Sequence, residues 1–405
     1  MTNYQAHFLM DDEAIKDFVV SELQLFPDKT TLEVAEIGDG NINYVHQVID
    51  QATEKTVVVK QADKFLRASG RPLDLARNRI EADILTIQGE LAPQFVPAVF
   101  NYHEKMAALT MEDISDYQNM RYQMIEKNIF PKFSQEISQF LAEVLLPTTD
   151  LVLARDEKKQ RVKAFTNIEM SDISEDLVLT EPYWDYKKRN IITAGNEDFV
   201  MENLYQNDAL QVEVAYLRNQ FMNNSQALIH GDLHTGSIFI NHTGIKVIDP
   251  EFAFYGPMGY DIGNVLAHLV FPLILNQMDA HFDQDFDHWL TQSIEKVFDL
   301  TFEKIANTYD DQVKLPMYLL PGFKEKYLAE VMADSLGYAG TEIIRRVVGD
   351  TKVKELSLLP KKARIPAERI LIQFATDLIM NRDKIIHGQE ISAIFAKRGK
   401  DETTR

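Results

Sequence analysis

The sequence predicts an α+β fold with two lobes, a small N-terminal lobe built on a mainly antiparallel sheet and a large helical C-terminal lobe. Five strand-like runs fall within residues 1–114, whereas most of residues 115–405 carries apolar side chains at helical spacing. The stretch His230–Asn264 interrupts the helical pattern with loops, two short β-rich runs and several acidic residues. We therefore expect the chemistry to lie in this stretch.

Composition narrows the class of protein. The 405 residues are 45% hydrophobic and 26% charged, as in ordinary globular proteins with a sizeable core. The net charge of −20 argues against nucleic acid or an anionic membrane as a partner, and the absence of cysteine excludes disulfides and thiolate chemistry. The N-terminus does not resemble a signal peptide, and the most apolar segment, Val265–Leu275, is too short to span a bilayer. We expect a soluble, cytoplasmic protein.

The N-terminal lobe alternates strands and helices. Its expected strands are Thr31–Ile37, Tyr44–Asp50, Thr56–Gln61, Val96–Tyr102 and Met106–Met111, and its expected helices are Asp11–Leu23 and Arg77–Gly89. Between the first two strands, a glycine-containing loop that includes Gly40 and Asn43 could expose backbone N–H groups to phosphates, although such a loop is also typical of a simple turn. Lys60 ends the third strand, where it could reach phosphates or be merely a solvated lysine. Glu81, twenty-one residues later, could pair with it.

The C-terminal lobe shows helical periodicity in four segments. They are Phe133–Leu145, Phe286–Asn307, Phe323–Val348 and Ala367–Arg382. The region Thr148–Asp198 is less regular, and the charged tail from Lys397 is expected to fray. In the irregular region, Tyr183 and Trp184 could form a lid over a small substrate or simply pack in the core.

Three carboxylates are expected to converge in the stretch His230–Asn264. Asp232 lies in the loop HGDLHTGS, ahead of two short strands joined by Asn241–Gly244, and Asp249 and Glu251 follow in the motif DPE. Neighbouring buried acids repel each other unless a cation neutralises them. The stretch therefore predicts a cation close to these carboxylates.

This layout is that of protein-kinase-like phosphotransferases, in which a loop Asp positions the attacking hydroxyl and a later Asp holds Mg²⁺ on the nucleotide. The related aminoglycoside phosphotransferases and choline kinases usually read HGDLHPGN in the loop. Here the motifs HGDLHTGS, DPE and DGNIN, with the later pair Arg345-Arg346, resemble those of the methylthioribose kinase family. The resemblance extends over nearly the whole chain.

The resemblance implies a protein-kinase-like fold, ATP and Mg²⁺, with a nucleotide lobe at 1–114 and a catalytic and sugar-binding lobe at 115–405. It implies 5-methylthioribose as the substrate, phosphorylated at its anomeric hydroxyl in methionine salvage, and a homodimer. Asp232 would be the catalytic residue. Asp232, Arg345 and Arg346 would contact the sugar, and Asp249 and Glu251 would hold the metal. The expected nucleotide contacts are Gly40, Asn43, Lys60, Glu112, Asp113, Ile114, Asp249, Pro250 and Glu251, with Glu112–Ile114 as the hinge that reads the adenine edge.

Two positions in the motifs allow more than one interpretation. Ser237 stands where relatives carry an Asn metal ligand, so the second ligand could have moved to Glu251, or Glu251 could only form a local salt bridge. Arg345 and Arg346 occupy adjacent helical positions about 100° apart, so only one of them can face the substrate. On the sequence alone, a salt bridge within the helical lobe is the favoured interpretation of the pair.

Other chemistries fit the sequence less well. Zinc binding by His230 and His234 would need a helix, which the glycines of the loop oppose, and Ser237 lacks the G-x-S-x-G elbow of a nucleophile. The net negative charge of the chain would suit a kinase with a cationic acceptor, such as choline or an aminoglycoside, but the arginine pair would not. A catalytically dead nucleotide-binding module would be expected to have lost Asp232, Asp249 or Lys60, and all three are present.

Overall fold

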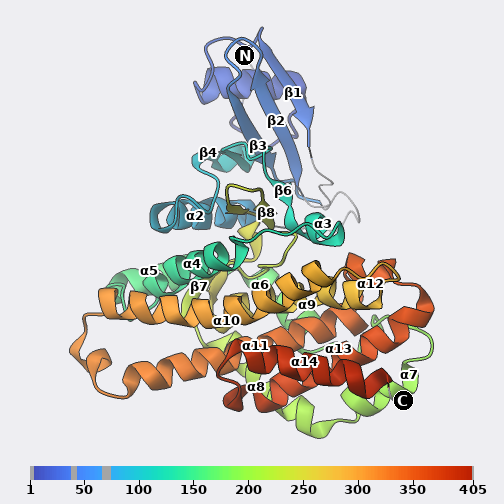
Figure 1. Cartoon of the computed structure of the whole chain (residues 1–405). Coiled ribbons are helices and arrows are strands. Elements are labelled where there is room, and N and C mark those ends of the chain that lie inside the picture. Colours follow the sequence, from blue (N-terminus) through green and yellow to red (C-terminus); the bar gives the residue numbers. More distant parts are fainter. Residues whose placement is uncertain (1–3, 38–42, 66–73, 404–405) are drawn as a thin grey trace. The chain divides into compact units, whose positions relative to one another are not determined.

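The computed structural model describes residues 4–37, 43–65 and 74–403 and confirms the α+β class. The chain forms two compact units, one made of Met1–Tyr117 with Lys246–Phe252 and the other of Gln118–Ile245 with Ala253–Arg405. Figure 1 shows the strands of the first unit in blue and the helices of the second mainly in green to red. The segment that carries the DPE motif therefore belongs to the unit that contains the sheet.

The first unit contains a five-stranded antiparallel sheet with the strand order β1-β2-β3-β5-β4. Its elements are α1 (Asp12–Asp17), β1 (Leu32–Glu36), β2 (Tyr44–Asp50), β3 (Thr56–Gln61), α2 (Ala76–Leu91), β4 (Val99–His103) and β5 (Ala108–Met111). All five expected strands are confirmed, and β2 and β3 have the expected bounds. The expected first helix ends early, because Phe18–Glu22 forms a π-helical turn after α1.

The apolar core of the first unit lies between its N-terminal helix and its sheet. Ile15, Phe18 and Val19 are buried against a cluster that includes Val48 and Val57 of adjacent strands. β-branched side chains pack well on such a half-buried sheet surface, which explains why the alternating runs of the sequence form strands.

The second unit is mainly helical. Its helices are α3 (Met120–Ile125), α4 (Phe133–Leu145), α5 (Arg155–Ala164), α6 (Ile168–Leu179), α7 (Glu197–Val200), α8 (Asp208–Asn223), α9 (Gly259–Met278), α10 (Gln284–Gln312), α11 (Phe323–Val348), α12 (Lys354–Leu358), α13 (Lys361–Asn381) and α14 (Gly388–Thr403). Short strands also occur along the chain: β6 (Gln118–Asn119), β7 (Ala227–Ile229), β8 (Ile238–Ile240), β9 (Ile245–Val247) and β10 (Phe254–Gly256).

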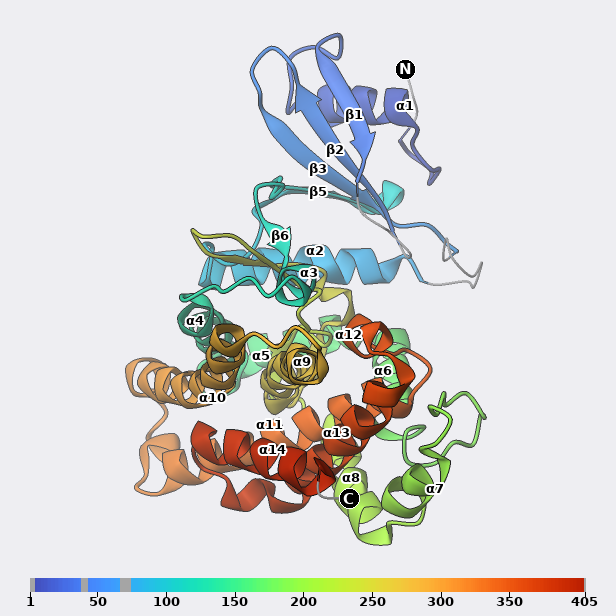
Figure 2. The ribbon, with the colours of Figure 1, turned by 45° about the vertical axis from the view of Figure 1, so that its right-hand side comes forward.

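The core of the second unit is formed where α9, almost entirely buried, packs on α10, α11 and α13 (Figure 2). Gly263 of α9 allows the closest approach, because a Cβ atom there would lie 2.5 Å from the Ser335 carbonyl oxygen of α11. No helix in the described ranges is both long and apolar enough to cross a membrane.

Three expectations for the helical region were inaccurate. The tail does not fray before Thr403, because Arg398 of α14 donates to both carboxylate oxygens of Asp377 at 2.6 and 2.7 Å. α13 begins at Lys361, ahead of the expected start at Ala367, and contains Pro366. The irregular region holds α5 and α6, and α5 is polar on nearly every side, so hydrophobic periodicity did not reveal it.

Candidate active site

Lys60 lies in a buried cluster of charges in the first unit. It is 4% exposed, and its Nζ donates to Glu81 Oε1 at 2.7 Å and to Asp249 Oδ1. The pairing with Glu81, which the sequence left open, is therefore present. Burial lowers the pKa of Lys60, but the carboxylates of Asp249 and Glu81 outweigh burial and raise it, so the ammonium stays charged. Burial raises the pKa of Glu81 to about 7, against the opposing effect of Lys60.

The DPE motif forms a tight turn in the same unit. Asp249 adopts φ 66°, a left-handed conformation that is uncommon for a residue other than glycine and that often marks functional sites. Glu251 is buried and lies 3.6 Å from Arg77 Nε and 3.3 Å from Asn43 Nδ2. Arg77 also donates to Asn43 Oδ1 at 3.1 Å. The local salt bridge considered for Glu251 is thus present, and its role as a metal ligand stays a prediction. Pro250, between the two acids, is buried.

The residues of this turn would fit a magnesium ion. Mg²⁺ is usually bound by one or two carboxylates together with water and phosphates, and Asp249 and Glu251 supply two carboxylates. Burial and the neighbouring Asp249 raise the pKa of Glu251, although Lys60 and Arg77 oppose this. Among the described residues, no three His, Asp or Glu side chains form a metal site by themselves, so further ligands would come from the nucleotide or from water. When bound, Mg²⁺ neutralises charge on the phosphates.

The expected hinge residues follow β5 in the first unit, and their side chains have partners there. Glu112 Oε2 accepts from the Ala98 N–H at 3.0 Å and from Lys246 Nζ at 3.2 Å. Asp113 Oδ2 accepts from Gln47 Nε2 at 2.7 Å. These contacts hold the segment before Ile114 in place, and its reading of the adenine edge stays a prediction. Gly40 lies outside the described residues.

The loop that carries Asp232 belongs to the second unit, and Asp261 of α9 holds it. Asp261 is 1% exposed, and its two oxygens accept from the backbone N–H groups of His230 at 2.6 Å and Gly231 at 3.0 Å. His230 Nδ1 accepts from the Asp232 N–H at 3.3 Å, as expected of a residue that steadies the loop. The base of the loop is β7, which pairs antiparallel with β10. The loop that carries Asp232 is therefore held by hydrogen bonds to its backbone.

The end of the loop is fixed by His234, Gly236 and Ser237. Ser237 Oγ donates to the Asp232 carbonyl at 3.1 Å, and the Ser237 N–H donates to His234 Nδ1 at 3.1 Å. Burial lowers the pKa of His234 to about 4, so the imidazole is neutral and its Nε2, 3.5 Å from Asp232 Oδ2, carries the proton. Gly236 is needed because a Cβ would lie 2.8 Å from His234 Cε1 and 3.2 Å from Arg121 Cζ. Burial raises the pKa of Asp232, but His234 and the two arginines of α11 hold it below its ordinary value.

The arginine pair of α11 lies beside Asp232. Arg346 Nη2 is 3.8 Å from Asp232 Oδ1, and Glu342 accepts from Arg346 Nε at 2.6 Å, from Arg345 Nη1 at 3.2 Å and from His268 Nε2 at 2.9 Å. Burial raises the pKa of Glu342, but the two arginines hold it well below its ordinary value. The salt-bridge interpretation is confirmed, because each arginine pairs with Glu342, and contact of Arg346 with a substrate stays a prediction.

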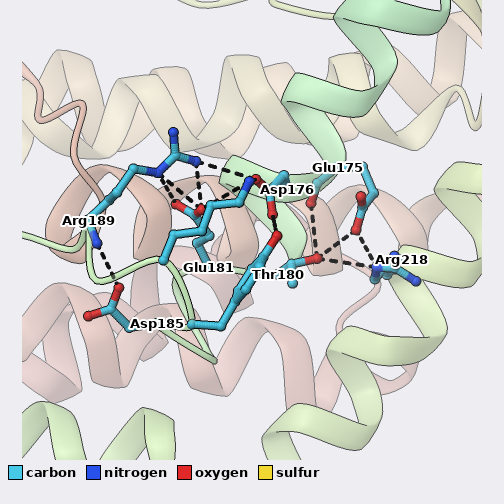
Figure 3. A network of polar contacts seen from close by, with 9 residues as sticks. Glu175, Asp176, Thr180, Glu181, Asp185, Arg189 and Arg218 are labelled. Atoms are coloured by element: carbon cyan, nitrogen blue, oxygen red, sulfur yellow. Dashed lines mark hydrogen bonds and ion pairs between the residues drawn. The ribbon is translucent and has the colours of Figure 1, made fainter.

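The segment after α6 is held by ion pairs rather than by apolar packing alone (Figure 3). Arg189 donates to Glu181 at 2.6 Å and to Asp176 at 3.3 Å, which closes the intervening turn. Tyr183 within this turn is 4% exposed, whereas Trp184 is 69% exposed. Core packing, one of the two interpretations, therefore describes Tyr183, and a lid role for Trp184 stays a prediction.

Sequence reasoning missed three residues that organise the clusters, namely Arg77, Asp261 and Glu342. Glu342 had a usable signal, because it precedes the two arginines by three and four positions on one helix, the spacing of helical ion pairs. Arg77 and Asp261 had none, since their partners lie far away in the sequence.

The fold and the motifs together define a class of protein. Residues 33–293 match the phosphotransferase enzyme family. The choline kinase from Cryptosporidium parvum Iowa II has a similar fold, with a TM-score of 0.51 over 97% of this chain and 96% of that one at 13% identity. The chain is thus a member of this phosphotransferase family, and the expected protein-kinase-like fold is confirmed.

More similar relatives narrow the class further. The chain is 37% identical over 384 residues to a methylthioribose kinase from Geobacillus sp. (strain WCH70), covering 93% of this chain and 92% of the relative. It is 36% identical to the methylthioribose kinase from Bacillus velezensis (strain DSM 23117 / BGSC 10A6 / LMG 26770 / FZB42), covering 94% of each. The chain belongs to the methylthioribose kinase family.

Proposed function

We propose that this chain is an ATP-dependent kinase that phosphorylates the anomeric hydroxyl of 5-methylthioribose and gives 5-methylthioribose 1-phosphate in methionine salvage. The observation that carries the proposal is Asp232, which is kept ionised next to Arg346 and Glu342 in a chain of this family. In the transfer, the acceptor oxygen forms a bond to the γ-phosphorus as the bond to the β-phosphate oxygen breaks. Asp232 orients the hydroxyl and accepts its proton, and ADP leaves.

The nucleotide is assigned to the lobe 1–114 and the DPE motif. Lys60 steadies the phosphates with its ammonium, which the surrounding carboxylates keep charged. Asp249 and Glu251 hold Mg²⁺. Gly40 and Asn43 belong to the loop over the phosphates, and the segment Glu112–Ile114 contacts the adenine edge.

The acceptor is assigned to the lobe 115–405, where the charges favour an uncharged sugar. Arg346 stands 3.8 Å from Asp232, and Arg345 shares Glu342 with it. A guanidinium keeps its positive charge at any ordinary pH and would repel choline or an aminoglycoside at this distance. It would instead donate hydrogen bonds to ring hydroxyls.

A turnover assay tests the proposal. ATP consumption is measured with methylthioribose, ribose, choline and kanamycin, and phosphorus NMR identifies the product. We expect methylthioribose to be the best acceptor and the product to be an anomeric phosphate. Comparable turnover of choline would refute the sugar assignment, and no turnover of any acceptor would favour a dead nucleotide-binding module. The proposed homodimer is tested by light scattering in solution, and the proposed cytoplasmic location by cell fractionation.

A further inference from the structure

Arg121, which is partly buried, and Glu355, which is buried, are charged residues that the proposed mechanism does not use. Glu355, on α12, is 1% exposed, and neither of its carboxylate oxygens accepts a hydrogen bond from another described residue. Arg121, in the first turn of α3, has two buried guanidinium nitrogens, Nε and Nη2, that also have no hydrogen-bond partner within residues 4–37, 43–65 and 74–403. Such groups are rare, because each loses its hydration without gaining a hydrogen bond. They therefore indicate a missing polar partner.

Arg121 lies beside the loop that carries Asp232, and α12, the helix that carries Glu355, approaches α3. The Arg121 N–H donates to the Thr235 carbonyl at 3.2 Å, and a Cβ on Gly236 would stand 3.2 Å from Arg121 Cζ. The helix α12 reaches α3 through Lys354, whose Nζ lies 4.4 Å from the centre of the Tyr122 ring. The two charges thus come from neighbouring short helices next to the loop that carries the catalytic aspartate.

The charges of Arg121 and Glu355 act on each other although the two residues do not form a hydrogen bond. Burial raises the pKa of Glu355, and Arg121 opposes this most strongly, followed by the backbone N–H of Glu355 itself and by Arg346. Burial lowers the pKa of Arg121, and Glu355 opposes that shift. Arg346 is also the residue that stands 3.8 Å from Asp232. A group that can both accept from a guanidinium and donate to a carboxylate would satisfy both side chains, and a hydroxyl does so.

We propose that Arg121 and Glu355 bind a ring hydroxyl of the sugar acceptor, one that is not phosphorylated. The inference rests on the proposed kinase function and adds two specificity-determining residues to it. A sugar that lacks this hydroxyl would leave the buried guanidinium and carboxylate without partners. Sites of this kind discriminate strongly against analogues that cannot make the hydrogen bond.

The test compares Glu355→Gln and Arg121→Lys with the unchanged chain, using methylthioribose and its 2-deoxy and 3-deoxy forms. Glu355→Gln should raise the KM for methylthioribose about 10- to 100-fold, because the hydrogen bond loses its charged acceptor, and should leave the KM for ATP unchanged. One deoxy sugar should already bind poorly to the unchanged chain, and the variant should weaken that sugar little further. Arg121→Lys, which keeps the charge but loses the forked donor, should give a smaller loss with the same pattern.

A matched control separates binding from stability. Glu368 is a buried glutamate whose oxygens accept from Thr193 at 2.6 Å and Asn196 at 2.9 Å, so Glu368→Gln should lower the Tm without changing the KM for the sugar. The inference is overturned if Glu355→Gln behaves in the same way, as it would if an ordered water joined the two charges. It is also overturned if the loss is equal for methylthioribose and both deoxy sugars.

The same series distinguishes this inference from the proposed function. If the unchanged chain phosphorylates another polyol and not methylthioribose, the substrate assignment fails, and that polyol with its deoxy forms tests Arg121 and Glu355 in the same way. If calorimetry detects no sugar binding to the unchanged chain and no sugar is turned over, both proposals fail.

Discussion

The two charged clusters of the molecule differ in their balance of charge. In the first unit, two cations face three carboxylates, whereas in the second unit three cations face three carboxylates. The members of the first cluster are Lys60, Arg77, Glu81, Asp249 and Glu251, and those of the second are Arg121, Arg345, Arg346, Asp232, Glu342 and Glu355.

This difference indicates what each cluster can bind. Crowded carboxylates repel one another, so the first cluster is stabilised by an added cation, as expected where a metal accompanies a nucleotide. The second cluster is already balanced. A charged ligand would be repelled either by the arginines or by the carboxylates of this cluster. An uncharged polyol can donate hydrogen bonds to the carboxylates and accept them from the arginines. The comparison thus supports the proposal that the first cluster binds the metal and the second binds the acceptor.

The largest effect is expected in the balanced cluster. Asp232→Asn should lower kcat roughly 10²- to 10⁴-fold, the usual contribution of a positioned base, and should leave the KM for ATP nearly unchanged. Steady-state kinetics with methylthioribose measures both constants. A loss of less than about tenfold, which corresponds to roughly 1.4 kcal/mol of barrier, would contradict the catalytic assignment.

The next effect should appear in the acidic cluster and should depend on metal. Glu251→Ala should raise the Mg²⁺ concentration needed for half-maximal activity by about 10- to 100-fold. Loss of a residue that only supports a metal ligand already has an effect of this size. Ser237→Ala is the matched comparison and should change it less, because Ser237 Oγ donates to the Asp232 carbonyl. A Mg²⁺ titration of both variants is decisive, and an unchanged profile for Glu251→Ala would leave only the local salt bridge to Arg77.

A third effect should separate the two arginines of α11. Arg346→Ala should raise the KM for the sugar by roughly tenfold, because this residue is the one 3.8 Å from Asp232, and should not change the KM for ATP. Arg345→Ala should have the smaller effect on the sugar, since the ion pair of Arg345 is with Glu342. Equal effects of both variants, or an equal change in the KM for ATP, would argue against the sugar-binding role.

The smallest effect concerns stability in acid. His268 contacts the balanced cluster through Glu342, and burial lowers its pKa from 6.5 to about 3, with Glu342 opposing the shift and Arg346 and His234 adding to it. Because the folded pKa lies below the unfolded one, the unfolded chain takes up the proton first as the pH falls. The contribution of His268 to the free energy of unfolding is therefore complete above pH 6.5 and is lost as the pH falls toward 3.

Urea unfolding of the unchanged chain and of His268→Gln at about pH 7.5 and about pH 5 measures this loss. The unchanged chain should lose more stability than the variant, by at most about 1.4 kcal/mol per pH unit. Comparing the two proteins separates the effect of His268 from that of carboxyl groups with raised pKa values. Asp334 is one of these: burial raises its pKa to about 6, and its contribution to the free energy of unfolding changes with pH in the opposite direction. Parallel pH dependence in both proteins would mean that His268 is not the group responsible.

Much of the local structure was predictable because its signals lie within a few residues. β2 and β3 have the bounds that their alternation of side chains indicates, and α4 and α11 begin and end where the helical spacing does. The family motifs were equally local, since each is a short run around Asp232 or Asp249. α5 escaped detection because few of its side chains are buried, so it has no apolar stripe to recognise.

The sequence by itself therefore determined the class of fold, the order of the motifs and the residues named in them, because periodicity and short motifs are properties of neighbouring positions. Only the tertiary structure decided which partners complete the clusters. Asn43 meets Glu251 across 208 positions, and Arg121 comes to lie beside the loop of Gly236 through the packing of α3. Contacts of this kind depend on how whole elements pack, and no spacing along the chain encodes them. The charge balance that separates the two clusters was for that reason visible only in the folded protein.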